Sequence, residues 1–345
     1  MRLGLNIGYL GPHGSWPSPE AAIEVVREAE RLGYAMLWTA EAFSSDAVSM
    51  LGWLAARTDR IALGTAAMQI PGRSPALTAM TAATLDLLSG GRFHLGLGVS
   101  SRQVAQDWHG VAFDHPLART REYVGLVRQA LHRRPLAHDG RHYPITPGAT
   151  LRLDMRPLRR AVPIYLAAVG PRNIDLAGEI ADGWLAVFLA PEGAADQMAA
   201  VRSGLQRSGR DPAAFDVAVT AAVAVGDRIE DCADRVRLYT MRYLAAMGDY
   251  YSRHAARIGY AEAVRAVRRD YQAGDLRAAA AAVPMPLLEN TSLLGPVPAI
   301  AERLRAYADV GVRTLSVLVP RGDADRAIPA LRAVAEALDK SGVGE

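Results

Sequence analysis

The sequence predicts an α/β protein that folds as a (β/α)8 TIM barrel with insertions. Apolar segments of strand length alternate with segments of helical periodicity along the chain, which is typical of parallel strands joined by crossover helices. Eight strand candidates are present, and eight parallel strands close a barrel. We expect a single domain over residues 1–345, with excursions at about 133–161 and 229–290 near the ligand side of the barrel.

The first four pairs of strand and helix occupy the part of the chain before residue 133. The first helix shows the pattern most clearly, because Ala22, Val25 and Ala29 repeat at helical spacing. Ser89 and the two glycines after it mark a turn before the fourth strand. The strands of this half are expected at 3–9, 36–39, 61–68 and 93–99, and the helices at 19–32, 46–57, 75–88 and 118–132.

The second half repeats the alternation with two interruptions. Residues 133–161 hold six prolines and glycines among basic residues, which predicts an excursion over the surface. A long helical region, about 229–282, forms the second interruption. The strands of this half are expected at 164–168, 184–188, 216–225 and 314–319, and the helices at 171–181, 194–208, 297–310 and 324–338.

The composition excludes several classes of function. The 39 basic and 36 acidic residues leave a net charge of +3 without a clustered basic patch, so we expect no nucleic-acid partner. Cys232 is the only cysteine, which excludes an internal disulfide and a multi-cysteine metal site. The longest apolar stretch, 278–288, is short and broken by Pro284 and Pro286, so we expect no membrane span. With no signal segment at its start, the chain is expected to be a soluble, cytoplasmic protein.

The ends of the predicted strands carry small and polar residues. Active sites of such barrels lie at the carboxyl ends of the strands. Glu41 is the only carboxylate at the carboxyl ends of the first four strands, so the carboxylate pair of a glycosidase is absent. Neither a Gly-x-Ser-x-Gly elbow nor a His-Glu-x-x-His metal motif occurs. Small residues at several strand ends suggest a flat ligand against the backbone, a cofactor that supplies the chemistry.

The turn after strand 164–168 predicts an anion site. Pro171 suits the first position of a helix, and the free N–H groups and dipole of that helix attract negative charge. Arg172 adds a positive charge. An ordinary turn between a strand and a helix is the alternative interpretation. The predicted site comprises Ala168, Val169, Gly170, Pro171 and Arg172.

Several motifs, in this order and spacing, resemble a known family. The chain is similar over nearly its whole length to the bacterial luciferase-like superfamily of barrel flavoenzymes, and within it to the branch that uses coenzyme F420, a deazaflavin. The motifs that carry the resemblance are Leu37-Trp-Thr-Ala-Glu-Ala-Phe43, Leu63-Gly-Thr-Ala-Ala-Met-Gln69, Leu95-Gly-Leu-Gly-Val-Ser100, Ala167-Ala-Val-Gly-Pro171 and Ala181-Asp-Gly-Trp184.

The resemblance implies an F420-dependent oxidoreductase, a reductase that transfers a hydride between the deazaflavin C5 and a small organic substrate. The family carries a non-prolyl cis peptide behind the central ring, which would fall between Ala66 and Ala67. The diester of the cofactor tail would lie over Ala168 to Arg172. The residues expected to border the ring are Thr39, Glu41, Val99, Ser100 and Gln103.

The chain departs from the family at the usual acid and base. Better-known deazaflavin dehydrogenases have Asp-His after the second strand and Glu after the fourth. Here Glu41 takes the Asp position, Ala42 replaces the His, and Ser101 falls where the Glu would be. An unsaturated carbonyl or imine of secondary metabolism needs less protein acid than an alcohol does. We expect its proton from Glu41 or Tyr9, with His13 or water as alternatives.

The substrate is expected above the cis peptide, among aromatic residues. Asn6 and Tyr9 from the first strand, Trp16 from the loop after it, and Trp184 are the predicted contacts. For Trp16 and Trp184, the alternative to a contact with substrate is a place in the hydrophobic core.

A homodimer is expected through helices 46–57 and 75–88, where Leu51, Trp53, Leu77 and Met80 exceed the apolar bulk that one inward face requires. Two other functions stay open. One is an FMN-dependent luciferase-like monooxygenase fed by a partner reductase, and the other is a non-catalytic ligand-binding barrel.

Overall fold

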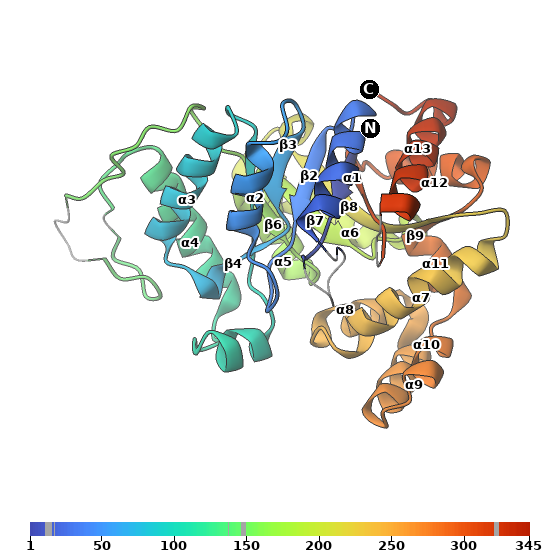
Figure 1. Ribbon diagram of the computed structural model, residues 1–345. Helices are drawn as coiled ribbons and strands as arrows, with labels where there is room; N and C mark the ends of the chain where they lie inside the picture. The colour runs from blue at the N-terminus through green and yellow to red at the C-terminus, as the bar shows by residue number, and fades with distance from the viewer. Residues whose placement is uncertain (11–15, 17, 137, 146–149, 321–323) are drawn as a thin grey trace.

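Eight parallel strands close a barrel in the computed structural model, which describes residues 1–10, 16, 18–136, 138–145, 150–320 and 324–345 (Figure 1). The barrel closes because β10 pairs with β1 on one side and with β8 on the other. This confirms the predicted fold class. The barrel strands are β1 (Arg2–Asn6), β2 (Met36–Thr39), β3 (Ala62–Thr65), β5 (Phe93–Gly98), β6 (Ile164–Ala167), β7 (Gly183–Val187), β8 (Asp216–Val225) and β10 (Thr314–Leu318).

Helices surround the strands, as the periodicity predicts. In the first helix, the Ser18 hydroxyl caps the free N–H of Ala21, Pro19 takes the first turn, and Val25 and Val26 are buried. The outer helices are α1 (Pro19–Arg31), α2 (Ala47–Ala55), α3 (Pro75–Leu88), α4 (Pro116–Leu131), α5 (Pro171–Ile180), α6 (Ala195–Ser208), α12 (Val297–Asp309) and α13 (Ala324–Ser341). None of the helices in the described residues is long and apolar enough to cross a membrane.

The expected strand 61–68 is interrupted. β3 ends at Thr65, the peptide between Ala66 and Ala67 is cis, and the chain resumes as the short strand β4 (Met68–Gln69) beside β5. The cis bond lies where the resemblance implies it. Close packing explains the glycine opposite, because a Cβ on Gly96 would collide with the Thr65 carbonyl oxygen.

The second excursion is a helical insertion with a core of its own. It contains α7 (Ile229–Ala245), α8 (Asp249–Ala255), α9 (Ala261–Gln272), α10 (Leu276–Ala281) and α11 (Met285–Thr291), which lie together beside the barrel in Figure 1. A strand that the sequence analysis missed, β9 (Ser292–Gly295), pairs with the second half of β8 and ties the insertion to the barrel. Val236, Val267 and Leu288 are buried in the insertion core.

The first excursion lies elsewhere. Its Arg159 forms an ion pair of 2.7 Å with the buried Asp86 of α3, and the backbone N–H of His142 donates to Glu122 of α4. None of the described residues of 133–161 lines the large cavity of the barrel. The described residues of this segment therefore do not form the wall of the cavity, although His142 lies beside His115 at the start of α4. Its charged groups hold it against α3 and α4 on the outside of the barrel.

Aromatic side chains fill the amino-terminal end of the barrel. The Tyr165 ring makes edge contacts with Trp38 and His94, at centroid distances of 5.2 Å and 5.8 Å. Burial, helped by the charge of Arg159, lowers the pKa of His94 from 6.5 to about 4. His94 is thus a neutral, partly buried side chain near the start of β5, away from the carboxyl ends of the strands where the site is sought.

Candidate active site

A large cavity opens at the carboxyl ends of the barrel strands. Its volume is about 2230 Å³, and α7 and α8 of the insertion form part of its wall. A pocket for one drug-sized ligand measures about 300–1,000 Å³, so this cavity has room for two molecules. The predicted site residues that line it are Asn6, Tyr9, Glu41, Ala66, Ala67, Val99, Ser100, Gln103, Ala168, Val169, Gly170, Pro171 and Arg172. His13 lies outside the described residues.

The floor of the cavity is nearly free of side-chain bulk. The cis peptide between Ala66 and Ala67 faces Gly98, where an added Cβ would lie 3.4 Å from the Ala67 Cβ. Thr39 supports this floor from below, because its carbonyl oxygen accepts a hydrogen bond of 2.6 Å from the Ala66 N–H. The Thr39 side chain is fully buried and does not line the cavity. The prediction that Thr39 borders the ring is therefore corrected to a role beneath the floor.

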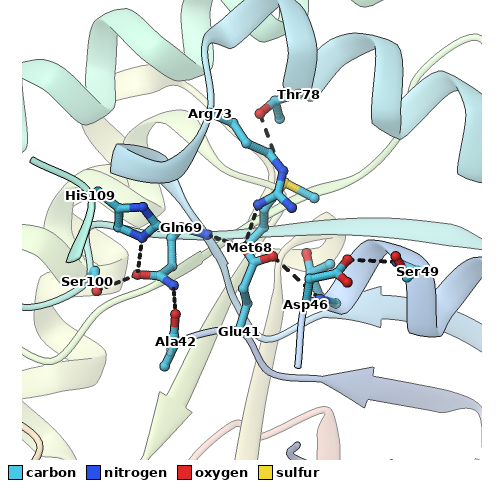
Figure 2. Close-up of polar contacts among 12 residues, drawn as sticks. Glu41, Ala42, Asp46, Ser49, Met68, Gln69, Arg73, Thr78, Ser100 and His109 are labelled. Carbon is cyan, nitrogen blue, oxygen red and sulfur yellow. Dashed lines mark hydrogen bonds and ion pairs between the residues drawn. The ribbon is translucent and has the colours of Figure 1, made fainter. Parts of the chain in front are cut away.

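Glu41 is held by three groups of the protein (Figure 2). Its carboxylate forms an ion pair of 2.6 Å with the Arg73 guanidinium and accepts from the Gln69 N–H at 3.1 Å. The other oxygen faces the N–H of Ala47, at the start of α2, at 3.4 Å. The Glu41 side chain is 8% exposed and that of Arg73 18%, so this is a largely buried ion pair. A carboxylate with these partners fixes the loop after β2.

The Gln69 amide joins three segments of the site (Figure 2). Its nitrogen donates to the Ala42 carbonyl at 2.6 Å, and its oxygen accepts from the Ser100 hydroxyl at 2.8 Å. His109 Nε2 lies 3.3 Å from the same oxygen, so this nitrogen carries the hydrogen. Ser100 is held in the left-handed backbone region, with φ of 62°. The network thus sets the end of β5 against the end of β2.

His109 was missed by the sequence analysis. It follows a π-helical segment, Val104–Trp108, in which no apolar periodicity marks a functional position. The only signal available was its place shortly after the fourth predicted strand.

The start of α5 opens onto the cavity. Gly170 is its N-cap residue, and no side chain caps the helix. A Cβ on Gly170 would meet no atom within 4 Å, so free space adjoins this helix end. The exposed Arg172 adds a positive charge there. A helix N-terminus with free space and a cation has the features of an anion site.

The two tryptophans do not reach the cavity. Trp184 is 0% exposed, and its indole N–H donates a hydrogen bond of 2.8 Å to the Ala168 carbonyl. Trp16 is 1% exposed. Neither indole lines the cavity, so the prediction that they contact substrate is corrected: both belong to the core. Trp184 instead holds the strand end that leads into Gly170.

Tyrosines form the aromatic wall that was expected from the tryptophans. Tyr9, shortly after β1, lines the cavity together with five tyrosines of the insertion: Tyr239, Tyr243, Tyr250, Tyr251 and Tyr271. Burial raises the pKa of Tyr9 well above 10.0, and Tyr243, Tyr251 and Glu41 raise it further. The phenol is therefore neutral at physiological pH. The described residues contain no group of His, Cys, Asp and Glu side chains that would hold a metal ion.

Known proteins are similar to this chain in sequence over most of its length. A Mycobacterium tuberculosis protein named as a coenzyme F420-dependent oxidoreductase is 35% identical over 96% of this chain and 99% of its own length. The 5,10-methylenetetrahydromethanopterin reductase of Archaeoglobus fulgidus is 29% identical over 86% of this chain and 89% of its own.

Solved structures support the fold. The coenzyme F420-dependent tetrahydromethanopterin reductase of Methanopyrus kandleri superimposes with a TM-score of 0.82 and 22% identity, over 96% of this chain and 98% of that one. The family model described as luciferase-like monooxygenase matches residues 3–314. On this match, which spans most of the barrel and the insertion, the chain belongs to the luciferase-like monooxygenase family.

Proposed function

We propose that this chain is a coenzyme F420-dependent oxidoreductase that reduces a small organic substrate. The observation that carries the proposal is the continuity of two surfaces in one cavity. A flat floor at Ala66, Ala67 and Gly98 leads to the free start of α5 at Gly170. The names of the F420-dependent relatives support the choice of cofactor.

The residues present fit a flat ring that carries an acidic tail. Ala66, Ala67 and Val99 offer a surface for the ring, and Ser100 and Gln103 border it. The turn at Val169, Gly170 and Arg172 would hold the diester, because its free space and charge suit an anion. Bound there, the cofactor supplies a hydride at C5.

Tyr9 is the group that we propose as proton donor. Its hydroxyl has no hydrogen-bond partner in the described part of the chain, and its raised pKa keeps the proton on the oxygen at neutral pH. Glu41, the other candidate, is occupied by Arg73 and two backbone N–H groups. Asn6, whose amide donates to the Thr220 hydroxyl at 3.2 Å, lines the same region and would position the substrate.

A titration of the purified full chain with F420 and, separately, with FMN tests this function. We expect F420 to bind at least about tenfold more tightly than FMN, a difference of about 1.4 kcal/mol. Tight binding of FMN alone would favour the monooxygenase, and binding of neither would favour a non-catalytic barrel. Absorbance of the two chromophores gives both affinities directly.

We also propose that the chain forms a homodimer through α2 and α3. Four apolar side chains of α3 are 46–59% exposed: Leu77, Met80, Leu87 and Leu88. Together they form a large exposed apolar area for one helix. Leu51, by contrast, is fully buried in the barrel core and is not available to a partner. As further partners we propose a small-molecule substrate, and we propose no nucleic acid.

A further inference from the structure

The cavity extends from the floor into a lobe of four tyrosines. We define the tyrosine lobe by Tyr9, Tyr239, Tyr243 and Tyr251, all of which line the cavity. The rings contact one another: Tyr243 lies 4.8 Å from Tyr239 and 4.8 Å from Tyr251, the latter at 78°. These are the distances and edge-to-face angles at which aromatic rings attract. The lobe is therefore an ordered aromatic wall.

Phe188 supports the lobe from behind. This residue follows β7, is 7% exposed and has a φ of 53°, and its ring stacks on Tyr239 at 5.9 Å. It also makes edge contacts with Tyr243 and Tyr251. The Phe188 carbonyl pairs with His254 of α8 at 2.9 Å. The barrel thus fixes the position of the insertion's tyrosines.

The lobe faces the floor of the cavity. The turn between α7 and α8 crosses to the end of β5, where Gly248, with φ of 79°, packs against Ser101. Tyr243, Tyr251 and Glu41 lie near enough to Tyr9 to raise its pKa. Tyr9 lines the same cavity as Ala66, Ala67 and Gly98 of the floor. A ligand bound in the lobe would therefore share one cavity with a cofactor ring bound on the floor.

The lobe carries no charge but offers hydrogen-bond donors. The pKa values of Tyr243 and Tyr251 are raised by burial, and no arginine or lysine affects either of them. Burial also raises the pKa of Tyr250, a further tyrosine of the cavity lining, but Arg102 and Arg253 offset part of that rise. The Tyr9 and Tyr251 hydroxyls have no partner among the described residues. A buried site of this kind disfavours a charged ligand and rewards a neutral one that accepts hydrogen bonds.

We propose that the tyrosine lobe binds a neutral, planar, conjugated carbonyl compound. Planarity suits the rings of Tyr239, Tyr243 and Tyr251, and the carbonyl oxygen accepts from the hydroxyls of Tyr9 and Tyr251. None of the four lobe side chains carries a positive charge to pair with a carboxylate or phosphate; Arg235 and Arg242 of α7 line the same cavity but are not part of the lobe. The lobe is a substrate site only if the proposed function is correct, and the assignment rests on that function to this extent. The binding test itself needs no cofactor.

Calorimetric titration of the full chain with three probes tests the assignment. Acetonaphthone is neutral, planar and conjugated, naphthoate is the matched anion, and acetyldecalin is the saturated, non-planar ketone. We expect acetonaphthone to bind at least about tenfold more tightly than either of the others, about 1.4 kcal/mol. Equal or tighter binding of naphthoate or acetyldecalin overturns the proposal.

Variants place the probe in the lobe. Tyr239→Leu and Tyr251→Leu should each weaken acetonaphthone binding at least fivefold, while Tyr260→Leu, a tyrosine of the same insertion outside the cavity lining, should leave it unchanged. If a leucine variant fails to fold, Tyr251→Phe keeps the ring but loses the hydroxyl that donates to the carbonyl oxygen, and it should also weaken acetonaphthone binding. Unchanged affinity in all folded lobe variants overturns the assignment.

A parallel F420 titration separates the two proposals. The lobe variants should bind F420 as the unmodified chain does. Loss of F420 affinity in all of them would overturn the lobe as a separate substrate site. If the chain binds acetonaphthone but does not bind F420, the assignment of the lobe stands and the proposed function is rejected.

Discussion

The Glu41 carboxylate lies 2.6 Å from the Arg73 guanidinium and also accepts a hydrogen bond from the Gln69 backbone N–H. This arrangement predicts that Glu41→Gln destabilises the protein, because it leaves a largely buried guanidinium without its counter-ion. We expect a loss of about 2 kcal/mol in the free energy of unfolding, measured by urea denaturation.

Arg73→Met and the double variant provide the control for Glu41→Gln. The double variant should lose less than the sum of the two single losses, since the two side chains interact directly. A Glu41→Gln protein of unchanged stability but much lower turnover would contradict the structural role and restore Glu41 as the catalytic acid.

His94 predicts a sensitivity to mild acid. Its pKa is about 4 in the folded protein and 6.5 ordinarily, so on acidification the unfolded chain binds the proton first. The stability that His94 contributes is complete above pH 6.5 and is lost as the pH falls towards 4, by about 3 kcal/mol in all. His94→Gln should flatten the pH dependence of unfolding in this window. Identical pH profiles for the two proteins would show that another group is responsible.

Trp184→Phe tests the support of the anion turn. The variant loses the indole N–H that donates to the Ala168 carbonyl at 2.8 Å, which we expect to cost about 1–3 kcal/mol of stability. Because Ala168 leads directly into Gly170, F420 affinity should fall as well. Tyr307→Phe is the matched control, since it loses a buried hydrogen bond to the Leu189 carbonyl away from the turn. An equal effect of both variants on F420 binding would refute a local role for Trp184.

The exposed face of α3 predicts a dimer that one charge disrupts. Met80 is 54% exposed at the centre of this face, and Met80→Arg should convert the dimer to a monomer in light scattering. Leu276→Arg, at an exposed leucine of α10, should stay dimeric. A monomeric unmodified chain at micromolar concentration would disprove the proposed assembly.

The regular elements were predictable because their patterns are local. The strands Met36–Thr39 and Asp216–Val225 and the helix Pro75–Leu88 have the predicted bounds, since apolar period, proline and glycine mark their ends. β9 was missed because its four residues directly follow a helix, and a short apolar segment there reads as a continuation.

The site was less predictable, because it depends on which way side chains point in three dimensions. Trp184 lies on a strand whose alternate residues face either the core or the cavity, and the sequence alone did not distinguish them. Tyr239 and Tyr243 stand four residues apart in α7, which places them on one face of the helix but does not say what that face contacts. Their partner Phe188 lies directly after β7, about 50 residues away.

The claim that this cavity holds F420 is tested most directly by titrating Gly170→Ala and Gly170→Asp with F420 beside the unmodified chain. Because a Cβ at Gly170 meets no protein atom within 4 Å, both variants should fold with unchanged stability. We predict that Gly170→Ala binds F420 within about threefold of the unmodified chain and that Gly170→Asp binds it at least about tenfold more weakly, since its carboxylate repels the diester. Equal F420 affinity in Gly170→Asp and the unmodified chain would contradict the account.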